Sequence, residues 1–201
     1  SQKTSLIFYQ SYEEDNYAES RSIREPVENN EDIANVFDDI SYSKGGAVLQ
    51  MLESAITPPV FRRGVRGYLR RHAGGNATAE DLMQALEAAT GNSRVTEIAH
   101  SYISQPGVPL IAVDWQCHDE QLAIQIEQQR YLPAGSTVNL EQEWNIPACL
   151  TLIHGNQPTP VCHTLERRQQ DFTHAVAQCP DAVMPNHNGH GYYRCPPPNA
   201  K

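Results

Sequence analysis

The hydrophobic pattern of the chain changes its period near residue 107. Before that point apolar residues recur every three or four positions, which is the spacing of one face of an α-helix. After it apolar and polar residues alternate, as at Leu122, Ile124 and Ile126, which is typical of half-buried β-strands. The pattern therefore predicts an α+β protein of two domains, in which an α-helical part precedes an antiparallel β-sandwich.

Four short helices are expected between residues 40 and 104, joined by tight turns that contain proline or glycine. In the third of them, Thr78 is the expected N-cap and Gly91 the expected stop. The predicted helices and the apolar residues that share a face are 42–56, with Gly45, Leu49, Leu52 and Ile56; 58–75, with Phe61, Val65 and Leu69; 76–91; and 93–104, with Val95, Ile98, Ala99 and Tyr102.

The change of period also predicts where the domains divide. We expect residues 1–106 to be the helical part, residues 107–195 to be the β-sandwich, and residues 196–201 to be a proline-rich tail or linker. The sandwich is expected to contain short strands separated by Gly, Pro and Asn, and to end with a turn and one more strand between Met184 and Cys195.

Charge and hydropathy exclude some partners. The 201 residues carry a formal net charge of −9, so nucleic acid and anionic membranes would be repelled at long range. No apolar run approaches the roughly 20 residues that span a bilayer. We expect neither a nucleic-acid partner nor a membrane span in this chain.

All five cysteines lie in the second half of the chain, from Cys117 to Cys195. Disulfides in an oxidising compartment and buried free thiols both fit this crowding. The odd count leaves at least one thiol without a partner in the chain. The crowding alone favours an extracytoplasmic location.

The eight histidines do not form a recognisable metal motif, because neither H-E-x-x-H nor C-x-x-C occurs. His187 and His190, in "NHNGH", fit either a loose loop site or a solvated turn, and the turn is the better interpretation. Five arginines of the second predicted helix fit either an anion patch or a solvated basic face, and the face is preferred: Arg62, Arg63, Arg66, Arg70 and Arg71. We expect no metal site in this chain.

The stretch "DDISYSKGGAVLQML", residues 38–52, is unusual because two adjacent glycines follow a tyrosine at the start of a helix. By its position Tyr42 begins the apolar stripe, so from the residues alone it reads as a core tyrosine. Gly45 and Gly46, however, would let a neighbouring segment approach the helix closely. The residues by themselves leave both interpretations open.

An ordered series of motifs resembles the aminopeptidase N-type zinc metallopeptidases, the gluzincins. "FDDISYSKGGAVLQML" is similar to the family segment that carries its second catalytic tyrosine. "SRSIREPVENNEDI" resembles the segment before that helix, and "FRRGVRGYLRRHAGGNATAEDLMQAL" and "SYISQPGVPLIAV" resemble the segments after it. "QQRYL", "WNIPACL" and "NGHGYYR" are similar to the β-sandwich that follows in the family. The series covers nearly the whole chain in order.

The resemblance implies a zinc aminopeptidase that removes N-terminal residues from peptides with metal-activated water. Tyr42 would be the catalytic residue, donating a hydrogen bond to the oxyanion, while Lys44, Gly45 and Gly46 would be structural residues near the site. The family's zinc motif and its G-x-M-E-N motif are absent. The chain is therefore expected to be a fragment that binds no catalytic zinc, is inactive alone, and packs against a missing N-terminal catalytic portion.

One alternative comes from another class of protein. The 201 residues would then form a non-catalytic helical and β-sandwich binding module. The aminopeptidase interpretation is preferred because the motifs occur in the family's order.

Overall fold

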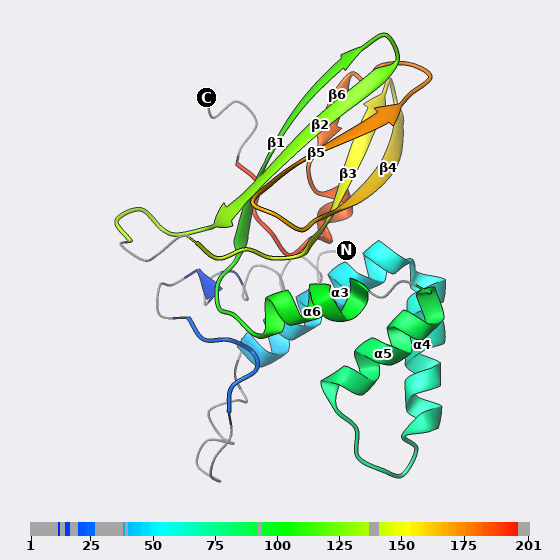
Figure 1. Cartoon of the computed structure of the whole chain (residues 1–201), viewed down its shortest axis with the longest axis vertical. Helices are drawn as coiled ribbons and strands as arrows, with labels where there is room; N and C mark the ends of the chain where they lie inside the picture. The colour runs from blue at the N-terminus through cyan, green and yellow to red at the C-terminus, as the bar shows by residue number, and fades with distance from the viewer. Residues whose placement is uncertain are drawn as a thin grey trace.

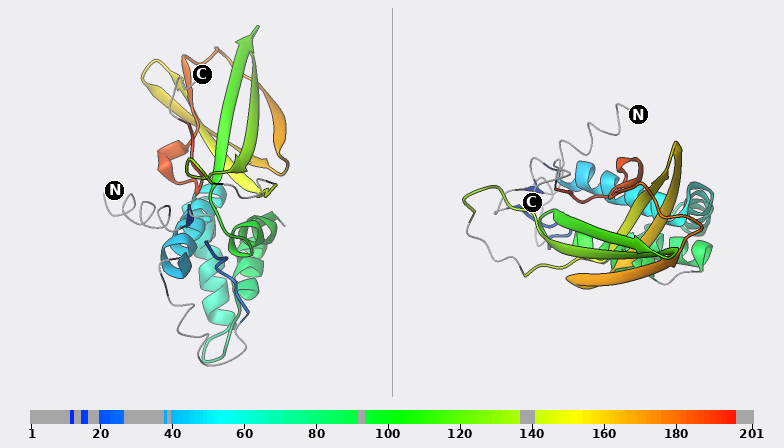
Figure 2. Two further views of the ribbon diagram at one scale, coloured as in Figure 1. Left: turned by 90° about the vertical axis from the view of Figure 1, so that its left-hand side faces the viewer. Right: turned by 90° about the horizontal axis from the view of Figure 1, so that it is seen from above.

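The computed structural model describes residues 12, 15–16, 20–26, 38, 40–91, 94–136 and 141–196. Within them, helices gather at one end of the molecule and two three-stranded antiparallel sheets at the other (Figures 1 and 2). The helical elements are η1 (Ile40–Lys44), α3 (Gly45–Ile56), α4 (Pro58–Arg71), α5 (Ala79–Thr90) and α6 (Arg94–Ile103). The predicted α+β class is confirmed. The predicted tail lies outside the described residues from position 197 onward.

Helix α5 begins and ends as its sequence predicts. The Thr78 side chain accepts a hydrogen bond from the Asp81 amide, and the Asp81 carboxylate accepts one from the Thr78 amide, which together make a capping box. At the other end Gly91 adopts a left-handed conformation with φ 73°, and its amide donates to the Glu87 carbonyl at 2.8 Å. Local side-chain chemistry is therefore sufficient to define both ends of this helix.

The buried face of α3 is rotated by part of a turn from the predicted apolar stripe, of which only Leu52 is fully buried. The helix buries Ala47, Val48, Met51 and Leu52, whereas Gly45 and Leu49 are only partly buried. Apolar residues occupy most of the circumference of α3, so periodicity could not select the buried face. Packing against α6, α4 and strand β3 selects it instead.

The stripe predicted for α4 is also partly wrong, because Leu69 is 60% exposed. The buried residue of α4 is Gly64, which lies against Leu86 and Ala85 of α5. A glycine at this crossing lets the two helix backbones approach closely. Phe61 and Val65 lie beside the contact and are half-buried.

Two glycines of α4 provide a matched test of that crossing. A Cβ at Gly64 would lie 3.0 Å from Leu86 Cα and 3.1 Å from the Ala85 carbonyl oxygen, whereas a Cβ at Gly67 meets nothing among the described residues within 4 Å. Both Gly→Ala changes gain the same helix propensity, about 1 kcal/mol. We expect Gly67→Ala to stabilise the chain, and Gly64→Ala to be less stable than Gly67→Ala by about 1–3 kcal/mol because of overpacking. Urea unfolding of both variants measures the difference, and equal midpoints would contradict it.

The two sheets have strand orders β1-β2-β5 and β4-β3-β6. Leu122, Ile124 and Ile126 of β2 are buried, as the alternating pattern predicts. They share one hydrophobic core with Ile146 and Leu150 of β3, so the two sheets pack face to face. The strands are β1 (Pro109–His118), β2 (Gln121–Arg130), β3 (Ile146–His154), β4 (Gln157–Leu165), β5 (Gln169–Ala175) and β6 (Ala182–Met184), followed by the 3₁₀ turn η2 (His187–Gly189).

The strand predicted near the C-terminal end is wrong. Residues 191–193 form a bend, and Arg194 makes only a single parallel bridge with Leu110 of β1. Its amide donates to the Pro109 carbonyl and its carbonyl accepts from the Ile111 amide, both at 2.8 Å. Tyr192 and Tyr193, which the alternating pattern would place on opposite faces, are both buried. Beyond this single bridge the described residues show no strand pairing here, so residues 191–194 do not form a regular strand.

Four of the five cysteines form disulfides. Cys149 and Cys162 are register partners on β3 and β4, and Cys117 of β1 is joined to Cys179 after β5. Cys195 is the remaining thiol, and its burial raises its pKa to about 12. Of the two interpretations of the cysteines, the disulfides are therefore confirmed. Disulfides are typical of proteins in oxidising compartments. Among the helices that the structure describes, none combines the length and apolar character of a membrane span.

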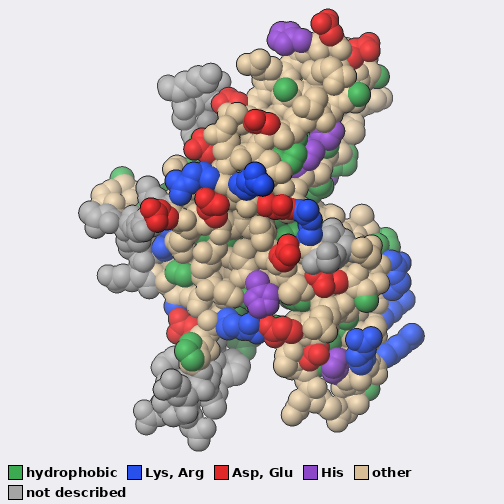
Figure 3. Space-filling model, viewed as in Figure 1, with side chains coloured by type: hydrophobic (Ala, Val, Ile, Leu, Met, Phe, Trp, Pro, Cys, Tyr) green, Lys and Arg blue, Asp and Glu red, His purple; other side chains and the backbone are tan. Residues whose placement is uncertain are grey.

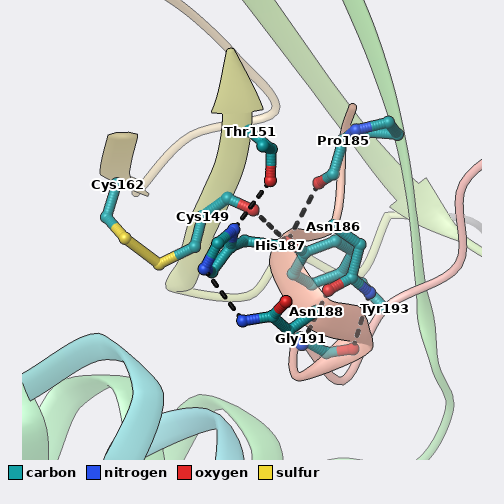
Figure 4. Close-up of a disulfide and its surroundings, with 9 residues drawn as sticks. All are labelled: Cys149, Thr151, Cys162, Pro185, Asn186, His187, Asn188, Gly191 and Tyr193. Atoms are coloured by element: carbon teal, nitrogen blue, oxygen red, sulfur yellow. Dashed lines mark hydrogen bonds between the residues drawn. A yellow bond between two sulfur atoms is a disulfide. The ribbon is translucent and has the colours of Figure 1, made fainter. Parts of the chain in front are cut away.

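The surroundings of the Cys149–Cys162 disulfide also account for one of the histidines in "NHNGH" (Figure 4). The His187 Nδ1 atom lies 2.7 Å from the Thr151 hydroxyl, and its Nε2 atom lies 2.9 Å from the side-chain nitrogen Nδ2 of Asn188. Both ring nitrogens of His187 thus have protein partners. This geometry favours the turn interpretation over a loop metal site.

Candidate functional site

Tyr42 lies in the π-helical turn η1, directly before α3. Its amide donates to the Asp38 carbonyl at 3.1 Å, while its side chain is 65% exposed. The core interpretation of this tyrosine is therefore wrong. The Tyr42 ring thus lies outside the buried face of α3, and single π turns are frequent at functional sites.

The turn that carries Tyr42 is held by Asp38 and Arg21. The Ser41 amide donates to Asp38 Oδ1 at 3.0 Å, so Asp38 is the capping residue of this turn. The Arg21 guanidinium donates to both carboxylate oxygens of Asp38, through Nε at 2.9 Å and Nη2 at 2.5 Å. Burial opposes ionisation of Asp38, but the Ser41 amide and then Arg21 outweigh it and lower the pKa of this carboxyl. The turn is thus anchored by a two-bond ion pair.

On the other side of Tyr42, Lys44 is completely buried. Its ammonium lies 2.9 Å from Asp15 Oδ2, and both side chains have no exposed surface. The same ammonium donates to the Gln105 carbonyl at 3.1 Å. Burial lowers the pKa of Lys44, and the Asp15 carboxylate opposes that shift. A buried charge of this kind requires its partner, so the two side chains form one unit.

Asp15 connects this ion pair to two other parts of the chain. Its Oδ1 accepts from the Gly107 amide at 2.8 Å, and its Oδ2 accepts from the Tyr192 hydroxyl at 3.0 Å. Gly107 lies between α6 and β1, and Tyr192 belongs to the C-terminal bend. The network around Lys44 therefore joins the N-terminal end of α3 to the junction between the helical and β parts.

Gly45 and Gly46 follow Lys44 on the first turn of α3. A Cβ at either position would meet nothing among the described residues within 4 Å. Gly46 is exposed and Gly45 is partly exposed. The surface beside Tyr42 is therefore unobstructed by the described part of the chain.

The basic residues of α4 lie apart from the Lys44 network. All five arginines are exposed, and in Figure 3 Lys and Arg side chains gather over this helix, at the lower right. The apolar residues Phe61 and Val65 take the inner side. This distribution fits the solvated basic face better than an enclosed anion site.

No group of three or more His, Cys, Asp or Glu side chains is placed to hold a metal ion in the described residues. Among the functional residues, the sequence reasoning missed Asp15, Arg21 and Tyr192. Asp15 lies in the acidic stretch "YEEDNY", where a carboxylate is expected to be solvated. Only the tertiary structure brings it to Lys44, 29 residues away in the sequence.

Comparison with known proteins shows which sequences this chain resembles. The family model described as the peptidase family M1 domain matches residues 3–102. A puromycin-sensitive aminopeptidase from Caenorhabditis elegans is 29% identical over 177 residues, covering 87% of this chain and 18% of that protein. A glutamyl aminopeptidase from Bitis rhinoceros is 36% identical over 140 residues, covering 67% and 14%. Tricorn protease-interacting factor F2 from Thermoplasma volcanium is 33% identical over 139 residues, covering 69% and 17%.

The chain belongs to the M1 peptidase family of aminopeptidase N-type metallopeptidases. It spans only 14% to 18% of the length of these three relatives. The region matched by the family model contains Tyr42, Lys44, α3 to α5 and all but the last residue of α6, whereas the sheets lie beyond it.

Proposed function

We propose that this chain is part of a zinc-dependent aminopeptidase that hydrolyses N-terminal residues from peptides. Residues 1–106 would be the C-terminal part of its metallopeptidase domain, 107–195 its β-sandwich domain and 196–201 a linker. Membership of the M1 family supports the hydrolase class, and the printed names of the relatives support the aminopeptidase activity.

The observation that carries the proposal is the exposed phenol of Tyr42 on a turn that is anchored on both sides. The turn beneath it is anchored on one side by Asp38 and Arg21 and on the other by the buried Lys44–Asp15 pair. A fixed donor of this kind can stabilise the oxyanion that forms when a peptide carbonyl is attacked, because its orientation requires no reorganisation. We assign that role to Tyr42.

Lys44, Gly45 and Gly46 have structural roles in this proposal. Lys44 holds the turn through Asp15, and the two glycines leave the surface beside the phenol open to a peptide backbone. Substituting Tyr42 by Phe in the full-length enzyme tests the central assignment, with kcat as the readout.

The zinc ion belongs to the rest of the enzyme in this proposal. M1 aminopeptidases are zinc-dependent in general, but the described residues of this chain offer no cluster that fits a catalytic zinc. The N-terminal catalytic portion would supply the metal ligands and the general base and would pack beside η1 and α3. The two disulfides support an extracytoplasmic location.

The isolated 201-residue chain is therefore expected to show no aminopeptidase turnover. Tyr42 alone supplies neither an activated water nor a base, and the oxyanion donor acts only on a carbonyl already under attack. Hydrolysis of an aminoacyl p-nitroanilide, assayed with added Zn²⁺ and with the full-length enzyme as the positive control, measures this. Turnover by the isolated chain above the buffer rate would contradict the assignment of ligands and base to another part of the protein.

A further inference from the structure

His163 and His174 meet where the edges of the two sheets face each other. His163 is on β4, an edge strand of one sheet, and His174 is on β5, an edge strand of the other. Their Nε2 atoms lie 2.5 Å apart, and their ring centroids lie 4.6 Å apart. Both side chains are partly exposed. Two imidazole nitrogens from separate sheets thus converge on one accessible point.

Packing orients the rings of this pair. The His163 ring stacks on Phe172, with centroids 3.9 Å apart and an interplanar angle of 23°. Phe172 and His174 are two residues apart on β5, so they share one face of that strand. Burial, and next the proximity of His174, lower the pKa of His163 to about 4. Stacking on Phe172 therefore holds the His163 ring with its Nε2 atom close to that of His174.

We propose that His163 and His174 form a two-histidine site for a single divalent transition-metal ion, with Zn²⁺ as the representative ion, that bridges the two sheets. Imidazole nitrogens bind Zn²⁺ at about 2.0–2.1 Å, so tetrahedral ligands stand about 3.3 Å apart. The two Nε2 atoms need to separate by less than about 1 Å, a small movement for side chains on edge strands. Water would fill the remaining positions, since no third ligand is placed nearby among the described residues.

The chemistry balances without an added reactant. In the neutral pair the Nε2 atom of one ring carries a proton and donates a hydrogen bond to the Nε2 atom of the other ring. When the metal binds, that proton moves through solvent to Nδ1 of the same ring, and both Nε2 lone pairs face the ion. Neither Nδ1 atom has a hydrogen-bond partner among the described residues, so this tautomer change breaks no other contact.

The site does not depend on the proposed aminopeptidase activity, because it is built from β4 and β5 and its test needs no turnover. Isothermal titration of the metal-free 201-residue chain with ZnCl₂ at pH 7.5 is expected to show one bound Zn²⁺ per chain. His163→Gln and His174→Gln should each weaken binding at least 10-fold. MgCl₂ should show no binding, because Mg²⁺ prefers oxygen ligands.

His118→Gln is the matched control, since His118 is an exposed histidine at the end of β1. It should leave the Zn²⁺ affinity unchanged. Circular dichroism in EDTA establishes that each variant is folded, and His174→Gln serves as the test if His163→Gln is not. The proposal is overturned if the chain binds no Zn²⁺, or if binding survives both substitutions, or if His118→Gln weakens it equally.

Discussion

Replacing Tyr42 by phenylalanine in the full-length enzyme is expected to lower kcat by about 100- to 1000-fold, which corresponds to roughly 2.7–4 kcal/mol of transition-state stabilisation. Phenylalanine keeps the ring but removes the only donor of this side chain. The hydrogen bond would strengthen as charge develops on the carbonyl oxygen, so KM should change little. Steady-state kinetics on an aminoacyl p-nitroanilide give both constants.

Tyr68→Phe is the matched control for this experiment. Tyr68 lies on α4, where its ring contacts His72, and it has no part in the proposed site. The control should retain the wild-type kcat, and both variants should unfold at the wild-type temperature. If Tyr42→Phe keeps more than about half of the wild-type kcat, Tyr42 is not the oxyanion donor. That result would favour the non-catalytic binding module for this part of the chain.

Replacing Lys44 by methionine is expected to lower the free energy of unfolding by about 3–5 kcal/mol. Methionine has a similar length, so the loss is chiefly electrostatic: Asp15 would remain buried, with hydrogen bonds from the Gly107 amide and the Tyr192 hydroxyl and with the Arg130 guanidinium as a nearby cation, but without its ion-pair partner. Urea unfolding of the 201-residue chain measures this loss as a lower midpoint at unchanged m-value.

The double variant Lys44→Met/Asp15→Asn isolates the ion pair from the packing of Lys44. Removing the orphaned charge should recover a substantial part of the loss, so the two changes should be strongly non-additive. Arg66→Met is the control for removing a cation from an exposed position, and it should change stability by less than about 0.5 kcal/mol. A loss below about 1 kcal/mol for Lys44→Met, or additive effects in the double variant, would contradict the ion pair as an anchor.

These two experiments distinguish the proposed catalytic role of Tyr42 from the structural role of Lys44. Tyr42 faces outward and contributes little burial, so its loss should affect turnover and leave stability nearly unchanged. Lys44 is enclosed, so its loss should affect stability first and turnover through the position of the turn. A variant that is stable but slow has thus lost the function of the Tyr42 phenol. A variant that is unstable has lost the anchoring by the Lys44–Asp15 network.

Regular local signals in the sequence were reliable. Thr78 and Gly91 define the ends of α5 because capping depends on residues within one turn. The alternation at Leu122, Ile124 and Ile126 predicted the buried face of β2, since period two leaves only two faces to choose from. The sequence of strand β4 is not typical of a strand because it contains Pro158 and Pro160, and prolines are tolerated there because β4 is an edge strand.

The sequence by itself determined the α+β class, the four helices, the motif around Tyr42 and the family, because each rests on neighbouring residues or on ordered motifs. The tertiary structure decided which face of α3 is buried, since that helix is apolar on most sides. It also decided the pairing of the cysteines and the meeting of His163 with His174. Above all it placed Asp15 against Lys44, because a buried charge is stable only beside its partner, and partners distant in sequence meet only when the chain folds.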